Sequence, residues 1–253
     1  MSAFQDLFSN HAACYAQSRP KYPPALFSFV AGLSKARQLA WDVGTGNGQA
    51  AVGLADHFDR IIATDGSPSQ IAHARQHERV SYHIATAEAA GPKEGLEDGS
   101  VDLVTVAQAL HWFKFDVFYA NVRRVLRPGG VIAAWCYGIH QVEPAIDAVT
   151  DHYYREVTGP YWPSDRRFID EKYATLPFAF DEMAVDPRLE CREHWNLPQY
   201  VGYLESWSAT QRFREAQGAD PLDQIAEPLA KAWGDSETRR WVVWPIHMRI
   251  GTR

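Results

Sequence analysis

The fold of this chain is decided by the stretch Leu39-Ala40-Trp41-Asp42-Val43-Gly44-Thr45-Gly46-Asn47-Gly48-Gln49-Ala50. It opens with an apolar run and ends in three glycines at alternate positions, and Ala51, Leu54, Ala55 and Phe58 follow at helical spacing. The pattern predicts a buried strand, a tight loop and a helix. Glycines let a backbone approach a ligand closely, and the free N–H groups at a helix start attract an electron-rich group.

The spacing of the glycines separates two classes of cofactor site. A dinucleotide fingerprint reads G-x-G-x-x-G/A, which requires a small residue at position 49 when the count starts at Gly44. That position holds Gln49, so the dinucleotide register fails. The chain instead reads D-x-G-x-G-x-G from Asp42 to Gly48. An ordinary strand-to-helix turn is the alternative, and residues farther along the chain must decide.

Composition limits the classes of partner. With 253 residues, 46% of them hydrophobic, the chain is long enough for one large domain or a core domain with a cap. Its net charge of −6 argues against a general basic surface for nucleic acid. Cys14, Cys136 and Cys191 lack metal or redox spacing and indicate reduced thiols in a cytoplasmic protein without a metal site. We see no membrane span and no signal-peptide pattern.

Beyond the glycine loop, strand and helix patterns alternate. Further apolar strands are predicted at Arg60–Asp65, Val80–Ala85, Val101–Ala107 and Val131–Tyr137. A capping box at Ser67–Gln70 predicts a helix to about His77. Another helix is predicted to end at the turn Arg127-Pro128-Gly129-Gly130. The alternation predicts an α/β fold with a doubly wound parallel sheet and right-handed crossovers.

Asp65 ends the second predicted strand, 21 residues beyond Gly44. In related sheets an acid at about that distance accepts hydrogen bonds from ribose hydroxyls. A simple turn cap is the alternative, and the agreement of the spacing with the strand end favours the ribose role.

The stretch Gln108-Ala109-Leu110-His111-Trp112-Phe113 lies just past the end of the fourth strand. Ligands of open α/β sheets bind outside the carboxyl ends of the strands, at the point where the strand order reverses. These residues are therefore placed to face a cofactor and a substrate. A structural role for His111 is the alternative, and Trp112 is expected to form a pocket wall.

Two flanking regions are expected to cover this site. Residues 1–35 are predicted to form a helix, a stiff proline bend and a second helix from Pro24 to Leu33. This segment is either a lid that brings Tyr15, Arg19 and Tyr22 to the site or a packed N-terminal arm. Residues 140–187 are aromatic and too long for an ordinary connection, so we expect a cap insertion or a surface subdomain with its own core.

The remaining residues, 188–253, are expected to complete the sheet. A strand is predicted at Arg188–Trp195, helices at Leu197–Gln217 and Pro221–Gly234, and a last strand at Arg240–Ile250. Pro245 lies inside that last strand and predicts an edge position or a bulge.

In this order, the motifs resemble those of a class I S-adenosylmethionine-dependent methyltransferase of the type-11 kind, most strongly over residues 36–137. The flanking stretches Tyr15-Ala16-Gln17-Ser18-Arg19-Pro20-Lys21-Tyr22-Pro23 and Tyr203-Leu204-Glu205-Ser206-Trp207-Ser208 resemble the trans-aconitate methyltransferase-like branch. The resemblance implies a Rossmann-like, seven-stranded, mostly parallel sheet whose last strand is antiparallel. It also implies methylation of small molecules, often on carboxylate oxygens.

The resemblance gives roles to the residues already singled out, with residues 36–139 as the S-adenosylmethionine-binding core. The glycines Gly44, Gly46 and Gly48 admit the cofactor, Asp42 orients the loop and meets its amino-acid end, and Asp65 holds the ribose. Ala87 is expected to meet adenine through its backbone, although Thr86 stands where many relatives carry an acid. The remaining cofactor contacts are expected from Gln108, Tyr15 and Arg19.

The methyl acceptor is expected to be a small molecule bearing a carboxylate or a hydroxyl. A carboxylate needs a cation to hold it, with Arg19, Arg166, Arg167 and Arg212 as candidates, whereas a hydroxyl benefits from a general base, for which His111 is chosen. The predicted acceptor-binding residues are His111, Trp112, Trp162, Trp207 and Arg212.

Three other functions remain as alternatives. They are a methyltransferase acting on protein or RNA, a nicotinamide-dependent oxidoreductase on a related sheet, and a cofactor-binding regulator without catalysis. Gln49 does not fit the dinucleotide fingerprint, which disfavours the oxidoreductase. The negative net charge of the chain disfavours an RNA substrate. We expect a monomer or a homodimer that binds neither nucleic acid nor membrane.

Overall fold

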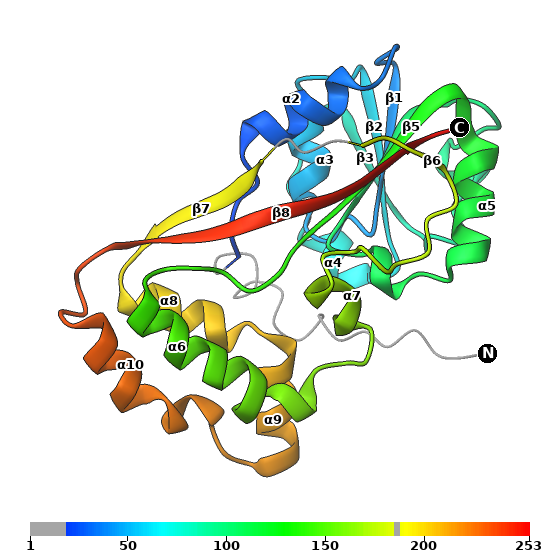
Figure 1. Ribbon diagram of the computed structural model, residues 1–253. Helices are drawn as coiled ribbons and strands as arrows, with labels where there is room; N and C mark the ends of the chain where they lie inside the picture. Colours follow the sequence, from blue (N-terminus) through cyan, green and yellow to red (C-terminus); the bar gives the residue numbers. More distant parts are fainter. Residues whose placement is uncertain (1–18, 185–187) are drawn as a thin grey trace.

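The computed structural model describes residues 19–184 and 188–253, whose strands form one twisted sheet (Figure 1). The strand order is β3–β2–β1–β4–β5–β8–β6, and β7 pairs with another part of β8. The neighbours from β3 to β5 are parallel, and β8 is antiparallel to β5, which confirms the predicted mostly parallel sheet with an antiparallel last strand. The described residues form eight strands where seven were predicted, because β6 and β7 both pair with the long strand β8. The strands are β1 (Leu39–Val43), β2 (Arg60–Asp65), β3 (Val80–Ile84), β4 (Val101–Ala107), β5 (Leu126–Tyr137), β6 (Asp181–Glu182), β7 (Glu190–Trp195) and β8 (Arg240–Thr252).

Alternation along the central strands divides the core into two layers. Leu103 of β4 packs in one cluster with Leu26 of α2 and Leu54 of α3, while the next residue, Val104, packs in another with Phe118 of α5. Both sheet faces are therefore buried, as a parallel sheet requires. The helices are α2 (Pro24–Gly32), α3 (Gln49–Leu54), α4 (Pro68–Ala72), α5 (Phe115–Val125), α6 (Pro144–His152), α7 (Arg166–Asp170), α8 (Leu197–Glu205), α9 (Ser208–Gln217) and α10 (Ala226–Trp233).

A helical cap made of α6, α8, α9 and α10 lies at one end of the sheet (Figure 1). In it, α6 packs against α10, which follows about 75 residues later in the chain. The cap interior is aromatic, because Tyr200, Tyr203 and Trp207 surround His140 together with Trp244 of β8. The segment after residue 196 thus contributes to the cap as much as the 140–187 insertion does.

The helix after β2 is shorter than predicted. The Ser67 side chain accepts a hydrogen bond from the Gln70 N–H at 3.3 Å, as a capping residue should, but α4 ends at Ala72 instead of near His77. The chain leaves the helix because the Arg75 N–H binds the Asn47 carbonyl at 3.0 Å. That bond draws the following segment against the glycine loop.

The predicted helix Leu197–Gln217 is two helices, α8 and α9. Between them, Ser206 Oγ donates to the Tyr203 carbonyl at 2.6 Å, and Trp207 takes an extended backbone with its indole buried. A hydroxyl that bonds back to the preceding turn competes with the helical ladder, so the chain changes direction here. The predicted segment Pro221–Gly234 likewise divides into the short turn η6 (Pro221–Gln224) and α10.

The stretch Arg127-Pro128-Gly129-Gly130 lies within β5 instead of forming a turn before it. Gly129 has a φ of 76°, and the β4–β5 register shifts nearby. Arg127 Nη1 binds the buried carboxylate of Asp102 at 2.8 Å, and the other oxygen of Asp102 accepts the Leu39 N–H at 2.9 Å. These contacts connect the beginnings of β1, β4 and β5.

Pro245 lies where β8 changes partner. Residues Arg240 to Pro245 pair with β7, and from Ile246 onward the strand pairs with β5. Of the predicted edge position or bulge, the edge position is the one observed, because β7 is the only named strand among the described residues that pairs with this part of β8, and a residue without an N–H is tolerated there.

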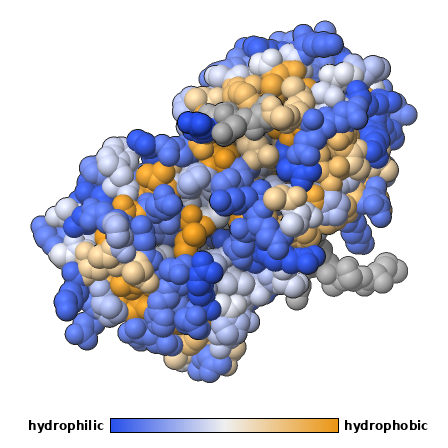
Figure 2. All heavy atoms as spheres, in the orientation of Figure 1, coloured by the Kyte–Doolittle hydropathy of each residue, from blue (hydrophilic) through white to orange (hydrophobic). Residues whose placement is uncertain are grey.

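The surface mixes residue types on the face drawn in Figure 2, where hydrophilic and hydrophobic side chains are interspersed. Among residues 19–184 and 188–253, no helix has both the length and the apolar character of a membrane span. Trp241 is 56% exposed, and its ring stacks on His194 of the paired strand.

Candidate functional site

The glycine loop turns between β1 and α3 through three left-handed residues. Gly44, Gly46 and Gly48 have φ values of 65°, 55° and 79°, which favour glycine. A Cβ on Gly44 would lie 2.6 Å from the Ala109 Cβ, and one on Gly48 would lie 2.2 Å from the Tyr82 hydroxyl. On Gly46, nothing would lie closer than 3.8 Å. Packing therefore demands the first and third glycines, whereas a Cβ on the second would make only an ordinary contact with Gln70.

Asp42 lies beneath this loop and is completely buried. Its two carboxylate oxygens accept hydrogen bonds from the hydroxyls of Thr45, at 2.5 Å, and Thr105, at 2.8 Å. Burial raises the pKa of Asp42 to about 6, although both hydrogen bonds act in the opposite direction. In this position the side chain joins the loop to β4, while its contact with the cofactor stays a prediction.

Asp65 stands at the carboxyl end of β2, beside the same loop. Its Oδ2 accepts the Gly46 N–H at 2.9 Å, and its Oδ1 accepts the Ser67 N–H at 2.8 Å. A carboxylate has about four acceptor positions, so one side chain can accept both backbone N–H groups and ribose hydroxyls. The turn-capping and ribose roles are thus compatible in one side chain.

Gln49, which broke the dinucleotide pattern, holds the N-terminal segment. Its Oε1 accepts the Tyr22 N–H at 2.7 Å, and its Nε2 donates to the Pro20 carbonyl at 3.4 Å. The same segment reaches the cap, because Arg19 Nη2 donates to the Ser206 carbonyl at 2.9 Å. Residues 19–22 therefore form a strap between the glycine loop and the cap. Sequence reasoning missed this role because no local pattern connects Gln49 with partners so far away in the chain.

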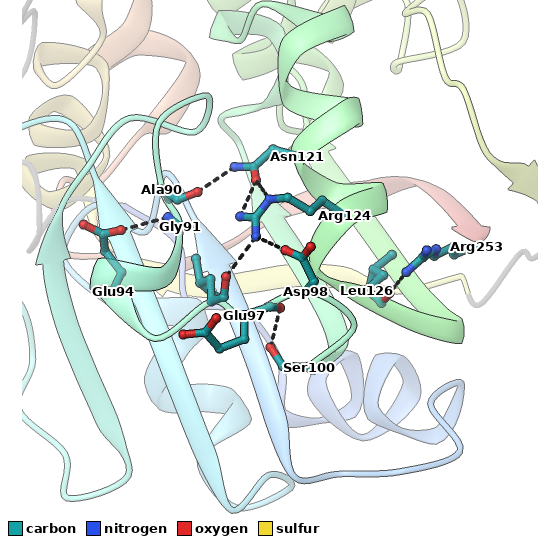
Figure 3. A network of polar contacts seen from close by, with 11 residues as sticks. Ala90, Gly91, Glu94, Glu97, Asp98, Ser100, Asn121, Arg124, Leu126 and Arg253 are labelled. Carbon is teal, nitrogen blue, oxygen red and sulfur yellow. Dashed lines mark hydrogen bonds and ion pairs between the residues drawn. The ribbon is translucent and has the colours of Figure 1, made fainter.

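The turn that carries Ala87 is held from the side of α5. Asn121 donates to the Ala87 carbonyl at 3.2 Å. It also donates to the Ala90 carbonyl at 2.9 Å, and Arg124 in turn binds Asn121 Oδ1 (Figure 3). Glu88, whose role the sequence left open, accepts the backbone N–H just before α5 at 2.9 Å. The predicted adenine contact through the Ala87 backbone stays a prediction.

Gln108 follows β4 in a left-handed conformation with a φ of 56°, which is uncommon for a residue other than glycine. Its Nε2 donates to the Tyr137 carbonyl at 3.0 Å. Its Oε1 is buried and has no hydrogen-bond partner in the described part of the chain. A buried acceptor of this kind needs a donor, which an ordered water or a group on a ligand can supply.

A pocket opens beside Gln108, between the sheet edge and the cap. It brings together several predicted residues, namely Arg19, Gln108, His111, Trp112, Trp162, Arg166 and Trp207. Sequence reasoning had not assigned to the site the residues Tyr137, Gly138, Pro163, Ile169, Tyr203 and Ser208. The latter residues come from the end of β5, from the insertion and from the α8–α9 junction, which no local motif connects.

His111 lines this pocket, but its environment differs from the expected one. The ring is only 6% exposed, with Nδ1 3.1 Å from the Tyr173 hydroxyl. Burial and the nearby charge of Arg166 lower the pKa of His111 to about 3. The premise that this imidazole titrates near neutral pH, which supported its choice as a general base, therefore does not hold. Its ring packs against Trp112 at 4.8 Å, as a wall residue would.

Four other candidates lie away from the pocket or outside the description. Arg212 does not line it, because the break before α9 brings only Trp207 and Ser208 to the cavity. Arg167 is exposed, with its guanidinium over the Phe168 ring. Tyr22 packs edge-on against Trp135 at 5.7 Å. Tyr15 lies outside the described residues.

Comparison with known proteins agrees with this geometry. A methyltransferase domain family matches residues 41–134. A putative methyltransferase of Dictyostelium discoideum is 35% identical, over 99% of this chain and 96% of that protein. This chain belongs to the S-adenosylmethionine-dependent methyltransferases. Family membership decides against the nicotinamide-dependent oxidoreductase.

Two further proteins resemble this methyltransferase over most of its length. A putative type II methyltransferase from Anaeromyxobacter dehalogenans has a solved structure that is 45% identical, with a TM-score of 0.85 over 92% of this chain and 97% of that one. Methyltransferase cfoB of Aspergillus candidus is 28% identical, over 95% of this chain and 84% of that protein.

The residues of this methyltransferase fit S-adenosylmethionine. Gly46, the carboxylate of Asp65 and the unpartnered Oε1 of Gln108 lie at the carboxyl ends of adjacent strands, where such sheets bind ligands. The cofactor carries ribose hydroxyls and an ammonium group, which are donors that a carboxylate such as that of Asp65 and the Oε1 of Gln108 can accept.

Proposed function

We propose that this methyltransferase transfers the methyl group of S-adenosylmethionine to a carboxylate oxygen of a small molecule. The observation that carries the proposal is a pocket lined by two arginines, Arg19 and Arg166, and by a histidine that is a weak base. A carboxylate is ionised at neutral pH, so it needs a cation to hold it and no base. A hydroxyl would need a proton acceptor that His111, with its lowered pKa, does not supply.

The chemistry needs alignment and the exclusion of water. S-adenosylmethionine supplies a methyl group activated by its sulfonium sulfur. A carboxylate lone pair forms the new carbon–oxygen bond while the methyl–sulfur bond breaks and leaves its electrons on sulfur, so no proton moves. The walls formed by Trp112, Trp162 and Trp207 exclude water and restrict the acceptor to a productive orientation.

The cap supports a small acceptor over a protein or RNA. The pocket lies between the sheet and a layer of helices, and its lining includes Tyr203 and Trp207 from that layer. A macromolecular substrate requires a flatter and more open surface. The net charge of −6 also disfavours RNA, whose phosphates attract basic surfaces.

The test begins with calorimetry using S-adenosylhomocysteine, which checks the cofactor site without an acceptor. The protein is then incubated with methyl-labelled S-adenosylmethionine and a panel of small carboxylic acids, each paired with the corresponding alcohol and amide. We expect label in the acids, released as methanol by mild alkali because the product is a methyl ester. Label that resists alkali, as in an ether or a methylamine, would reject carboxylate methylation.

A further inference from the structure

We propose that Arg166 binds the carboxylate of the acceptor and determines specificity, and that Tyr154 and Asp170 position its guanidinium. This inference rests on the proposed function, because it assumes a carboxylate acceptor in the pocket beside Gln108. The three residues come from the insertion, with Tyr154 in the helical turn η4 (Tyr153–Val157) and the other two at the ends of α7.

One edge of the Arg166 guanidinium is held by neighbouring side chains. Its Nε donates to the Tyr154 hydroxyl at 2.8 Å, and that hydroxyl donates to Asp170 Oδ1 at 2.5 Å. The same Asp170 oxygen lies 3.6 Å from Arg166 Nε, close enough for an ion pair. The guanidinium also lies over the Trp162 ring, 4.5 Å from its centroid. These contacts restrict the side chain before any ligand binds.

The other edge of the guanidinium is available to the pocket. Across the residues that the structure describes, neither Nη1 nor Nη2 of Arg166 makes a hydrogen bond, and the side chain is 18% exposed at the pocket lining. Two parallel N–H groups on a planar guanidinium match the two oxygens of a carboxylate. An arginine held only through Nε is therefore oriented for bidentate binding.

The other candidate arginines are less suited to this role. Arg19 donates an Nη hydrogen bond to the Ser206 carbonyl and lies over the Tyr203 ring, so it connects the strap to the cap. Arg167 is exposed on the outer side of α7, and Arg212 does not line the pocket.

The surroundings of Arg166 also describe the acceptor. Trp162 lies beside the guanidinium, and its ring centroid is 5.6 Å from that of Trp207. Aromatic walls exclude water, which strengthens an ion pair formed between them. The acceptor that fits is a carboxylate joined to a flat apolar body, and benzoate is a simple probe of that class.

The experiment measures benzoate binding to the complex with S-adenosylhomocysteine, by calorimetry and by the quenching of tryptophan fluorescence. We expect Arg166→Gln to weaken benzoate binding about 100-fold and Arg166→Lys about 10-fold. Lysine keeps the positive charge but lacks the two parallel N–H donors of the guanidinium. Arg167→Gln is the matched control on the same helix and should leave binding unchanged. The affinity for S-adenosylhomocysteine should stay the same in all four proteins.

The test of Tyr154 and Asp170 must distinguish positioning of the Arg166 guanidinium from a general loss of stability. Tyr154→Phe and Asp170→Ala should weaken benzoate binding about three- to tenfold at unchanged affinity for S-adenosylhomocysteine. Asp170→Asn should recover part of the loss, because an amide oxygen still accepts the Tyr154 hydroxyl. A structural role alone would instead lower the melting temperature without this selective loss and recovery.

The outcomes separate this inference from the proposed function. If the wild-type complex does not bind benzoate, or if Arg166→Gln binds it as well as the wild type, the role of Arg166 is rejected. In that case, carboxylate methylation is still decided separately by whether alkali releases the label from the panel of acids. If that panel yields only alkali-stable products, the proposed function fails and the assignment of Arg166 fails with it.

Discussion

The cofactor side of the site and its acceptor side are built in opposite ways. On the cofactor side, Asp42, the glycine loop and Asp65 are near one another because they end adjacent parallel strands. On the acceptor side, Arg19, Arg166 and Trp207 come from distant segments that meet only through the packing of the cap. Local backbone geometry thus forms the proposed nucleoside site, whereas long-range packing forms the proposed acceptor site.

The largest effect is expected from a change in the glycine loop. In Gly44→Ala, the new Cβ would lie 2.6 Å from the Ala109 Cβ at a φ of 65°, so crowding and backbone strain add. We expect a loss of about 3 kcal/mol in the free energy of unfolding and a loss of more than 100-fold in affinity for S-adenosylhomocysteine, by denaturant titration and calorimetry.

Gly218→Ala is the matched control for this substitution. Gly218 has a φ of 64°, but a Cβ added there would have no neighbouring atom within 4 Å, so it carries the same strain without the crowding. It should lose only about 1 kcal/mol and bind S-adenosylhomocysteine normally. Equal losses in the two variants would show that the close packing of the loop on Ala109 is unimportant.

The next effect is expected at the end of β2. Asp65→Ala should weaken S-adenosylhomocysteine binding about 30-fold, because it removes a charged acceptor from the ribose and frees the Gly46 N–H. Calorimetry would measure it, with the exposed Asp59→Ala as control. Asp65→Asn distinguishes the two causes, since an amide oxygen can still accept the Gly46 N–H. Unchanged affinity in Asp65→Ala would refute the ribose assignment.

Acid should affect the two sides of the molecule in opposite directions. The folded-state pKa of Asp42, about 6, lies above its ordinary 3.8, so its contribution to stability is complete below pH 3.8 and is lost as pH rises through 6. Burial lowers the pKa of His140 in the cap to about 3 from 6.5, so its contribution is present above pH 6.5 and is lost as pH falls toward 3.

Between pH 7 and pH 5, His140 alone should therefore reduce the free energy of unfolding by about 2 kcal/mol. In His140→Gln this contribution is absent, so lowering the pH from 7 to 5 should change the free energy of unfolding by about 2 kcal/mol in the stabilising direction relative to the same change in the wild type. His152→Gln, which replaces an exposed imidazole on α6, is the control. A pH dependence that His140→Gln leaves unchanged would contradict the lowered pKa.

The smallest effect tests the strap that joins the two sides. Gln49→Ala removes the hydrogen bonds to Pro20 and Tyr22 and should raise the acceptor KM about three- to tenfold, with a smaller change in cofactor affinity. Steady-state kinetics with a labelled acid would measure the acceptor KM, and calorimetry would measure the cofactor affinity. Gln141→Ala, at an exposed position with only backbone pairing, is the control. A larger effect on the cofactor than on the acceptor would place Gln49 wholly on the cofactor side.

Local patterns predicted the sheet well because hydrophobic periodicity and glycine spacing are properties of consecutive residues. The strand Val101–Ala107 was predicted with its observed bounds, and the loop after Val43 turns where its glycines indicated. Prediction was poorer where distant contacts override local preference, as at α4, which the Arg75–Asn47 hydrogen bond ends early.

The amino-acid sequence by itself determined the α/β sheet, the glycine loop and the position of Asp65, because each depends on neighbours in the chain. Only the tertiary structure decided which arginines reach the pocket beside Gln108 and how basic His111 is. The physical reason is that burial and charge proximity arise when segments far apart in the chain pack together. A linear pattern can place a histidine or an arginine near a site, but its pKa and its partners depend on the packing around it.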